Sequence, residues 1–173
     1  FVDASQVLST IRLCKDDSEI EKMRRAAQIA QQALRATLAT LREGMSEKEI
    51  ANELVIQLLR AGSDPGLPFE PIVALGENSA NPHAVPSDRA LHRGDLLLVD
   101  WGASYRGYLS DITRTFTFGD VSSELINAGR IVVQANQAAR AYGRAGVSAG
   151  EVDRAAREII EAAGFGEAFL DRT

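Results

Sequence analysis

The sequence predicts an α+β fold assembled from two related halves, and three observations support this prediction. Long segments carry apolar residues every three or four positions, which is the spacing of one face of an α-helix. Two runs near the middle of the chain have the composition of paired β-strands. A helix-start motif also occurs twice at a fixed separation, which indicates an internal duplication.

Residues 1–14 contain apolar side chains without a clear period. We interpret this segment as a strand or arm arriving from something upstream. It would then be the end of a preceding domain or a linker, and the patterned part of the chain would begin near residue 15.

Two helices are predicted in the first half. The first begins near Asp17, carries one apolar stripe and ends at Gly44, because glycine tolerates the positive φ common at helix C-termini. The second begins at the Ser-x-x-Glu capping box of Ser46 and Glu49, and it ends at Gly62.

Residues 63–94 contain all five prolines of the chain, so no helix is expected there. Within this region, residues 72–75 have the composition of a short strand. Residues 76–88 have the composition of a long ordered loop. A loop of that length in a compact domain is usually functional.

Two strand-like runs follow, at residues 95–103 and 109–118. The first is dense in Leu and Val, as a buried strand is, and the second alternates threonine with larger side chains. Gly107 lies between the runs, so we predict a β-hairpin.

Two further helices are predicted, and the second of them begins with a capping box at Ser148. Gly44 and Gly146 precede the two capping boxes at an offset of 146 − 44 = 102 residues, and the same offset relates Gly62 to Gly164. Each copy is a helix, a break, a capping box and a second helix. Only the first copy is followed by a loop and a hairpin, so we expect the chain to stop inside the second repeat.

Composition narrows the classes of partner. The chain has 173 residues, a net charge of −5 and a pI near 5.1, so we expect no nucleic-acid partner. Its longest aliphatic stretch, residues 96–99, is far too short to cross a bilayer, so we expect no membrane partner. No basic start precedes an apolar core, so we see no signal peptide and expect a cytoplasmic location.

The residues available for metal or acid–base chemistry are few. Cys14 is the single cysteine, so an internal disulfide and a cysteine-rich zinc site are both excluded. His83 and His92 are the only two histidines. Any such chemistry must therefore depend mainly on carboxylates.

A pair of aspartates is the strongest candidate. If the hairpin is symmetric about its turn, Asp100 and Asp111 lie directly opposite each other, with Cβ atoms about 4.5–5.5 Å apart. Two carboxylates at that distance repel unless a shared proton, an arginine or a divalent cation compensates. Arg106 lies in the turn and Arg114 points to the other face, so neither arginine is placed to bridge the pair. We therefore favour the hypothesis that a divalent cation such as Mg²⁺, Mn²⁺ or Ca²⁺ compensates the repulsion.

Two alternatives to a metal pair stay open. Both aspartates can flank the turn and face water, which is the commoner arrangement near a hairpin. A bulge at Gly102 or Gly107 would also break the register. The threonine-rich face beside Asp111 favours the metal hypothesis, because hydroxyl groups orient ligating carboxylates.

His83 lies in the proline-bounded loop, next to Asn81 and Pro82. It is either a surface histidine in a turn, or a donor to a substrate carbonyl or a proton carrier. His92 lies in a polar turn before a predicted strand, and we assign it to the surface.

Three stretches of the chain, residues 67–89, 94–102 and 107–116, resemble the pita-bread metallopeptidases. The run Ser110-Asp-Ile-Thr-Arg-Thr115 is typical of the Xaa-Pro branch, which comprises aminopeptidase P and prolidase. The likeness covers nearly the whole chain from about Lys15. It implies the pita-bread (creatinase/aminopeptidase) fold, an α+β domain of two ααββ halves.

The resemblance also implies a domain organisation. Residues 1–14 would be the exit from an upstream N-terminal domain or a linker, and residues 15–173 an incomplete catalytic domain. Within that domain, residues 15–120 would form the first half. Residues 121–173 would be the helical part of the second half, which is truncated in this chain.

By the same resemblance, Asp100 and Asp111 match the first two ligands of a dinuclear metal centre. His83 matches the histidine that contacts the scissile peptide, and Phe69 falls where the family lines its substrate pocket. Two divalent ions are implied, Mn²⁺ first, with Co²⁺ and Zn²⁺ as alternatives. The remaining ligands would lie beyond Thr173.

The implied reaction is hydrolysis of the peptide bond that precedes proline, by a hydroxide that two metal ions activate. The substrate would be a peptide with proline in second position for an aminopeptidase, or an Xaa-Pro dipeptide for a prolidase. The enzyme would be a homodimer. Creatinase, a relative that uses no metal, is disfavoured by the retained aspartates. The alternatives are a non-catalytic pita-bread module that binds peptide or protein, and a piece of the enzyme that is inactive alone.

Overall fold

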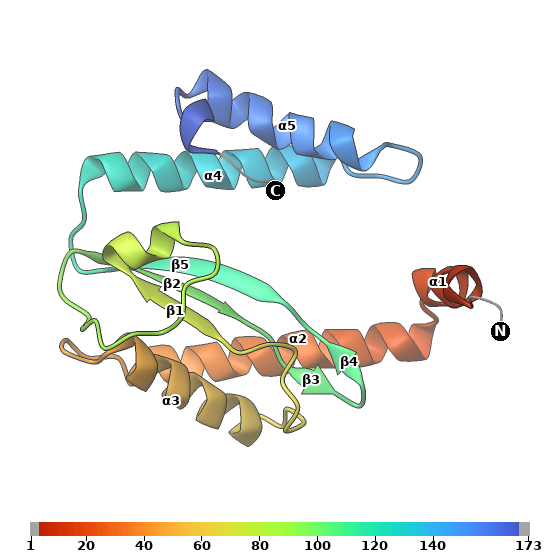
Figure 1. The fold of residues 1–173 in the computed structure, drawn as a ribbon, viewed down its shortest axis with the longest axis horizontal. Coiled ribbons are helices and arrows are strands. Elements are labelled where there is room, and N and C mark those ends of the chain that lie inside the picture. Colours follow the sequence, from red (N-terminus) through yellow and green to blue (C-terminus); the bar gives the residue numbers. More distant parts are fainter. Residues whose placement is uncertain (1–3, 170–173) are drawn as a thin grey trace. The chain divides into compact units, whose positions relative to one another are not determined.

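A computed structural model describes residues 4–169 of the chain, and Figure 1 labels its elements. The chain divides into two compact units, Phe1–Asp120 and Val121–Thr173. The first unit contains a β-sheet with helices, and the second is entirely helical within its described residues. Each unit is described by itself below.

The first element, α1 (Ser5–Leu13), is a helix, so the interpretation of residues 1–14 as a strand or arm is wrong for this segment. Its apolar side chains Leu8, Ile11 and Leu13 are 56%, 68% and 77% exposed. Because these three side chains are exposed, no core selects a regular apolar spacing among them, which is why their period is weak. Residues 1–3 lie outside the described part of the chain.

The predicted helix pair of the first half is α2 (Asp17–Leu38) and α3 (Glu47–Arg60). Both helices begin with a capping box, at Asp16 for α2 and at Ser46 for α3. In each box the cap side chain and a glutamate three residues later satisfy each other's backbone N–H groups. The start of α3 therefore confirms the motif predicted from the sequence.

The end of α2 differs from the prediction. The helix ends at Leu38 rather than running on to Gly44, because the N–H groups of Thr40 and Leu41 bond to carbonyls three residues back. Such bonds tighten the chain into a 3₁₀-like turn. Gly44 adopts a φ of 88° in the connection, and its N–H donates to the carbonyl of Leu91 over 2.9 Å.

The main sheet has three antiparallel strands, in the order β1-β2-β5. They are β1 (Ile72–Leu75), β2 (Asp95–Trp101) and β5 (Ile112–Phe118). Between β2 and β5, the tip of the hairpin forms a separate two-stranded ribbon of β3 (Ser104–Tyr105) and β4 (Tyr108–Leu109). The first strand predicted from the sequence, residues 95–103, thus ends two residues early, and the second, residues 109–118, is interrupted at residues 110 and 111.

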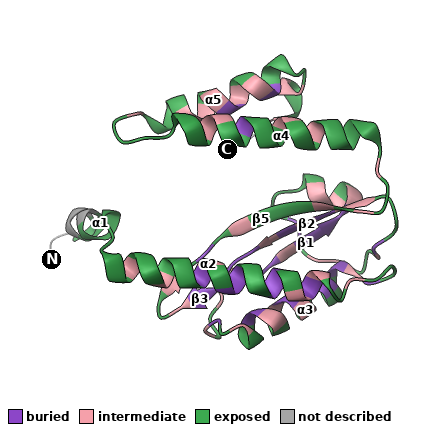
Figure 2. Ribbon diagram, turned by 180° about the vertical axis from the view of Figure 1, so that it is seen from behind, coloured by how far each residue is buried: buried purple, intermediate pink, exposed green. Residues whose placement is uncertain are grey.

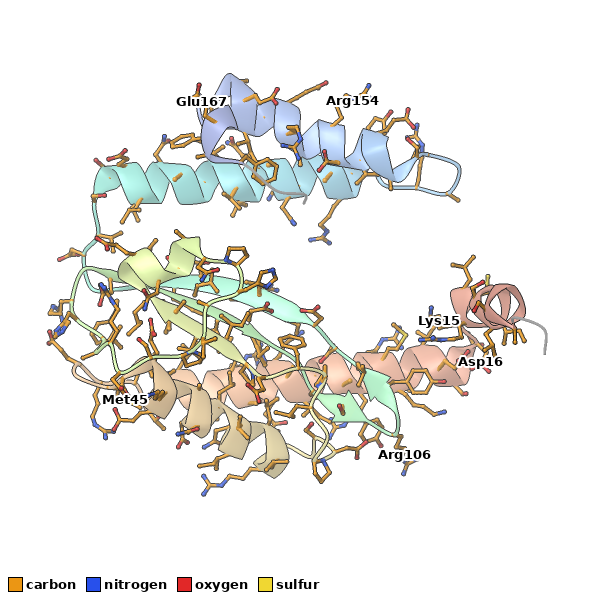
Figure 3. All side chains as sticks on the ribbon, viewed as in Figure 1. Lys15, Asp16, Met45, Arg106, Arg154 and Glu167 are labelled. Atoms are coloured by element: carbon orange, nitrogen blue, oxygen red, sulfur yellow. The ribbon has the colours of Figure 1, made fainter. Side chains whose placement is uncertain are left out.

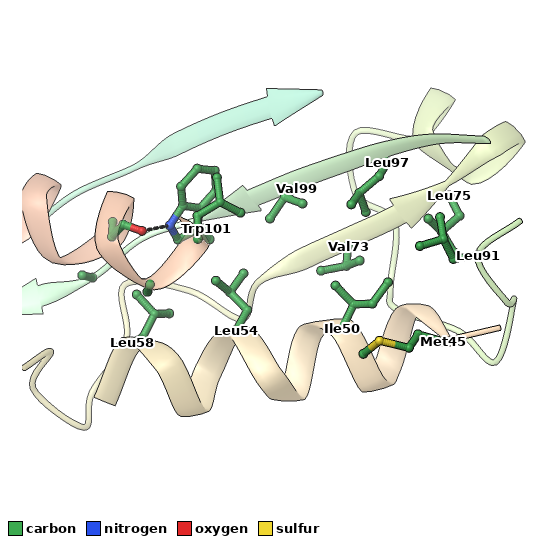
Figure 4. Close-up of a cluster of buried hydrophobic side chains, with 14 of the residues drawn as sticks. Met45, Ile50, Leu54, Leu58, Val73, Leu75, Leu91, Leu97, Val99 and Trp101 are labelled. Carbon is green, nitrogen blue, oxygen red and sulfur yellow. Dashed lines mark hydrogen bonds between the residues drawn. The ribbon is translucent and has the colours of Figure 1, made fainter. Parts of the chain in front are cut away.

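The core of the first unit lies between one face of this sheet and the helices (Figure 4). Alternate residues of the central strand are buried in it: Leu97, Val99 and Trp101. An apolar stripe of α3 faces them: Ile50, Leu54 and Leu58. The Trp101 indole N–H donates to the carbonyl of Ala30 over 2.9 Å, which satisfies the one polar atom of the ring. Figure 2 shows the buried residues on the inner sides of α2 and α3 and along the sheet.

The second unit contains α4 (Ser123–Tyr142), α5 (Ala149–Ala162) and the short 3₁₀ helix η2 (Gly166–Ala168). Its buried apolar cluster, within the described residues, consists of Ala135, Ala156 and Ile160. Across residues 4–169, none of the helices combines the length and apolar character that crossing a membrane requires.

The internal duplication is visible in the backbone. Helices α3 and α5 both have 14 residues, and both begin with a serine capping box. The glycines that flank α3, Gly44 and Gly62, have φ values of 88° and 99°. Their counterparts around α5, Gly146 and Gly164, have φ values of 92° and 83°. The repeat inferred from the sequence is therefore confirmed as a structural one.

Candidate metal centre

The hairpin that carries the two aspartates turns at Arg106 and Gly107. Both residues have positive φ, 51° and 81°, which is the signature of a two-residue type I′ turn. This turn lies one residue further along the chain than the symmetric centre assumed from the sequence. As a result, Asp100 pairs with Thr113 rather than with Asp111, and the prediction of directly opposed aspartates is wrong.

The two aspartates nevertheless share one face of the sheet. Asp111 lies just before β5, but the Ser110 N–H bond to the Ala103 carbonyl continues the β2–β5 register through it. Asp111, two positions before Thr113, therefore points to the same side as Asp100, and it raises the pKa of that carboxylate. Such diagonal neighbours have Cβ atoms about 7–8 Å apart or less, within which carboxylates converge. Val99 and Trp101, on either side of Asp100, point into the core, so the aspartates occupy the face away from it.

The surroundings of Asp100 raise its pKa above the ordinary value for an aspartate. Burial is the largest cause, a hydrogen bond with Thr113 acts in the opposite direction, and the neighbouring Asp111 raises the pKa further. One carboxylate oxygen, Oδ1, is buried and has no hydrogen-bond partner within the described chain. An unpaired buried oxygen beside a second carboxylate is costly, and a cation between the two groups would remove both penalties.

Gly102 lets the chain pack closely next to this pair. A Cβ atom at that position would lie 2.0 Å from the carbonyl oxygen of Ser110 and 2.9 Å from Cγ of Pro68. No side chain fits there unless the backbone moves. The Ser110 N–H donates to the carbonyl of Ala103 over 2.9 Å, so the register continues past the interruption. The bulge considered as an alternative is absent from this hairpin.

Neither nearby arginine takes the place of a cation. Arg106 lies at the tip of the hairpin (Figure 3), with its guanidinium 5.4 Å from the centre of the Tyr105 ring. Arg114 pairs with Val99, which places it on the opposite face from the aspartates. Its guanidinium donates to the backbone carbonyl of Thr113 over 2.7 Å. Within residues 4–169, no ion pair therefore joins Asp100 or Asp111 to a lysine or an arginine.

The residues present fit a hard divalent ion, but they form only part of a site. Carboxylate oxygens are the donors that Mg²⁺, Mn²⁺ and Ca²⁺ prefer. Among residues 4–169, no group of three or more His, Cys, Asp and Glu side chains is arranged to hold a metal. A complete centre would need ligands in addition to Asp100 and Asp111.

His83 lies on the loop that follows β1. This loop is not entirely irregular, because it opens with a short 3₁₀ helix, η1 (Gly76–Ala80), that packs against β1 and β2. Figure 1 shows η1 on the side of the sheet away from α3. The Asn81 side chain accepts a hydrogen bond from the His83 N–H over 2.9 Å, which fixes the turn there.

The His83 side chain is exposed, and no hydrogen bond or ion pair joins it to Asp100 or Asp111 in the described chain. The structure therefore brings the two aspartates together and leaves the imidazole accessible on a separate loop. His92 is also exposed, with its Nδ1 atom 3.9 Å from the carboxylate of Glu43, so its assignment to the surface is confirmed.

Phe69 is half-buried in the segment that leads into β1. The residue before it, Pro68, lies against Gly102, and Ile72 three residues later is the register partner of Asp100. The segment is held in place because the Ser104 hydroxyl donates to the carbonyl of Gly66. Phe69 is thus part of a chain segment that runs beside the carboxylate pair.

Sequence reasoning missed one carboxylate near this region. Glu47 is completely buried, and its side chain accepts hydrogen bonds from residues that flank the His83 loop. In the sequence it is simply the residue after the helix cap. The available signal was the repeat itself, since the position 102 residues later, in an otherwise matching motif, is Ala149.

A duplicated helix pair whose first copy carries a sheet with paired aspartates is the arrangement of a pita-bread metallopeptidase. Comparison with known families agrees with this class. The model for metallopeptidase family M24 matches residues 21–173, which is most of the chain. The chain belongs to metallopeptidase family M24.

Individual relatives give the same result. The Xaa-Pro dipeptidase of Pyrococcus furiosus is 36% identical over 170 residues, which are 98% of this chain and 49% of the relative. The crystal structure of an X-Pro aminopeptidase from Thermotoga maritima MSB8 matches with a TM-score of 0.91 and 39% identity, over 94% of this chain and 46% of that chain. A prolidase structure from Pyrococcus furiosus matches with a TM-score of 0.91 and 36% identity, over 96% of this chain and 49% of that chain. The pita-bread fold predicted from the sequence is confirmed, and the chain spans about half the length of these relatives.

Proposed function

We propose that the whole protein containing this chain is a metal-dependent exopeptidase that hydrolyses the peptide bond preceding proline. The observation that carries this proposal is the buried, unpartnered Oδ1 of Asp100 beside the carboxylate of Asp111. Membership of a metallopeptidase family supports the same conclusion. The substrate would be a peptide with proline in second position, or an Xaa-Pro dipeptide.

Asp100 and Asp111 would hold the metal from one side, with further ligands from outside the described residues. Two divalent ions are proposed, with Mn²⁺ as the first candidate and Co²⁺ or Zn²⁺ as alternatives. Bound divalent ions act as Lewis acids and lower the pKa of water enough for hydrolysis at neutral pH. The Thr113 hydroxyl, which hydrogen-bonds Asp100, would hold that carboxylate in a ligating orientation.

Two residues of this chain would act on the peptide itself. His83 is exposed on its loop, and its imidazole would donate a hydrogen bond to the peptide at the scissile bond, where negative charge develops. Phe69 would supply apolar surface for the side of the substrate that packs beside the carboxylate pair. A homodimer and a cytoplasmic location remain predictions that accompany this proposal.

The test uses the whole protein, loaded with Mn²⁺ and assayed against Xaa-Pro dipeptides and Xaa-Pro-Yaa tripeptides. We expect release of the amino acid that precedes proline from at least one of these substrates. Asp100→Asn and Asp111→Asn should each lower kcat/KM by about 100-fold or more and weaken Mn²⁺ binding in a calorimetric titration. Asp120→Asn, which alters an exposed aspartate after β5, is the matched control and should change neither quantity.

The outcomes separate the candidates. Peptide binding without turnover in the Mn²⁺-loaded protein would support a non-catalytic binding module instead. Cleavage of tripeptides but not dipeptides would indicate an aminopeptidase, and the reverse would indicate a prolidase. Unchanged Mn²⁺ affinity in both aspartate variants would overturn the metal centre.

A further inference from the structure

Glu47 is a completely buried carboxylate whose two oxygens are both used. Oε1 accepts hydrogen bonds from the Leu75 N–H over 2.7 Å and from the Asn78 side-chain amide over 2.9 Å. Oε2 accepts from the Ser87 N–H over 2.8 Å and from the Ser87 hydroxyl over 2.6 Å. Four donors converge on one side chain, which is the kind of arrangement that a buried charge requires.

These donors bracket the loop that carries His83. Leu75 ends β1 and Asn78 lies in η1, so both precede the histidine, whereas Ser87 follows it. Each carboxylate oxygen therefore holds one end of residues 75–87. The single side chain of Glu47 ties the two ends to each other and to the first turn of α3.

The start of α3 does not need this carboxylate. The capping box is made by Ser46 and Glu49, without the Glu47 side chain. In the second repeat, α5 begins with the same box and has the same 14-residue length, yet Ala149 occupies the corresponding position. Since the helix forms equally well with alanine there, the buried charge is explained by its loop contacts.

The loop contacts also keep the carboxylate ionised. Burial raises the pKa of Glu47, but the hydrogen bonds from Ser87, Asn78 and Leu75 more than offset that effect, so the pKa lies below its ordinary value. An ionised acceptor makes stronger hydrogen bonds than a neutral one, which suits an anchor between two chain segments.

We propose that Glu47 is a positioning residue that holds the two ends of the 75–87 loop together, so that His83 presents its imidazole to the substrate in one orientation. This inference rests on the proposed peptidase function. Glu47 itself would touch neither substrate nor metal, and it would act only through the loop.

Three variants of the whole protein test the inference. Glu47→Ala removes all four hydrogen bonds but keeps the capping box, as Ala149 shows. Ser87→Ala is a milder change that removes the hydroxyl bond to Glu47, together with the bond that the same oxygen accepts from the Arg89 N–H over 3.1 Å. It guards against a Glu47 variant that fails to fold. Thr37→Val is the matched control, because it removes a buried hydrogen bond, to the Ala33 carbonyl over 3.0 Å, that has no connection with the loop.

The first measurement is hydrogen exchange of residues 75–87, which needs no activity. Glu47→Ala should increase exchange at Leu75 and Ser87 by at least about 10-fold, while Thr37→Val leaves these two amides unchanged relative to the rest of the unit. If the loop amides in Glu47→Ala exchange as slowly as in the parent protein, the carboxylate does not hold the loop and the inference is wrong.

The second measurement is a double-mutant cycle with His83→Ala. Glu47→Ala should lower kcat by roughly 10- to 100-fold, with a smaller change in KM, because a misplaced group near the reacting bond costs about that much. In the His83→Ala background the same substitution should lower kcat by less than about 2-fold, since residues that act through each other are not additive. Ser87→Ala should show the same pattern at a smaller scale.

The two possible failures are distinguishable. Equal losses from Glu47→Ala in both backgrounds would show a general structural role and overturn the link to His83. An unsubstituted protein that cleaves no proline peptide would overturn the proposed function and the catalytic part of this inference. The exchange data would still decide whether Glu47 holds the loop.

Discussion

The two helix pairs of this chain begin in the same way but bury very different surfaces. Helices α3 and α5 share their length, their serine capping box and their flanking glycines with positive φ. In α3 the buried stripe is Ile50, Leu54 and Leu58, packed against the sheet. In α5 the buried residues, among those described, are Ala156 and Ile160, packed against α4.

The difference shows that local sequence determines where a helix begins and ends, whereas the surface it packs against determines which residues it buries. Caps and glycines act within a few residues, so both repeats start and stop their helices alike. Burial depends on what the helix packs against, and in the first unit that surface is the sheet. The two carboxylates to which we assign roles follow the same rule, since Asp100 belongs to the sheet and Glu47 contacts segments that extend from it.

The largest expected effect compares Leu58 with Ile160, which occupy equivalent positions in α3 and α5. Leu58→Ala should lower the free energy of unfolding by about 3–5 kcal/mol, because Leu58 is completely buried in the larger core. Ile160→Ala should cost only about 2 kcal/mol, since its cluster is small and its side chain is 7% exposed. Urea unfolding, followed by Trp101 fluorescence for the first unit and by hydrogen exchange of α5 for the second, measures both. Equal losses would contradict the difference in packing.

The next prediction concerns a substitution that disturbs the sheet, which is the part of the first unit that the described second unit lacks. Gly102→Ala forces a Cβ atom to within 2.0 Å of the Ser110 carbonyl oxygen, so the backbone must separate beside the aspartates. We expect a loss of about 2–3 kcal/mol in stability and weaker Mn²⁺ binding by the whole protein. Gly66→Ala is the control, because a Cβ atom there has open space. Calorimetry that shows unchanged Mn²⁺ affinity in Gly102→Ala would mean that this close approach does not position Asp100 and Asp111.

The fold was predictable from the sequence to the extent that its signals are local. Capping boxes, apolar stripes and the repeat predicted α2, α3, α4 and α5, and the strand runs predicted the sheet. The exact hairpin register was not predictable, because Arg106 at a positive φ is uncommon for a residue other than glycine. That one-residue shift of the turn places Thr113, not Asp111, opposite Asp100.

The candidate site was predictable in part for the same reason. Two aspartates separated by a hairpin fall on one face under either register, so their convergence did not depend on the error. Glu47 could not be identified, because its partners Leu75 and Ser87 lie 28 and 40 residues away in the chain. Only the folded loop brings those donors together.

A smaller effect should be equal in the two repeats. Ser46→Ala and Ser148→Ala each remove a side chain that accepts a hydrogen bond from a backbone N–H in the first turn, which costs about 1 kcal/mol. Exchange of the first-turn amides of α3 and α5 measures each loss separately. A loss of stability from Ser46→Ala several times larger than from Ser148→Ala would show that the start of α3 depends on the sheet. That result would contradict the conclusion that local sequence alone determines where these helices begin.

The smallest expected effect is a pH dependence confined to the first repeat. The pKa of Glu47 in the folded state lies below its ordinary value of 4.5, so ionised Glu47 stabilises the folded state above that pH. This contribution should be lost as the pH falls below 4.5 and through the folded-state pKa. The stability difference between the parent protein and Glu47→Ala should therefore be constant from pH 7 to about pH 5.5 and shrink at lower pH. Urea unfolding followed by Trp101 fluorescence across that range measures this stability difference.

The comparison variant is Ala149→Glu, which puts a carboxylate at the equivalent exposed position of α5. Its stability should depend much less on pH, because water solvates an exposed carboxylate in the folded and the unfolded state alike. A difference for Glu47→Ala that stays constant down to pH 3 would show that the four hydrogen bonds do not depend on the charge of Glu47.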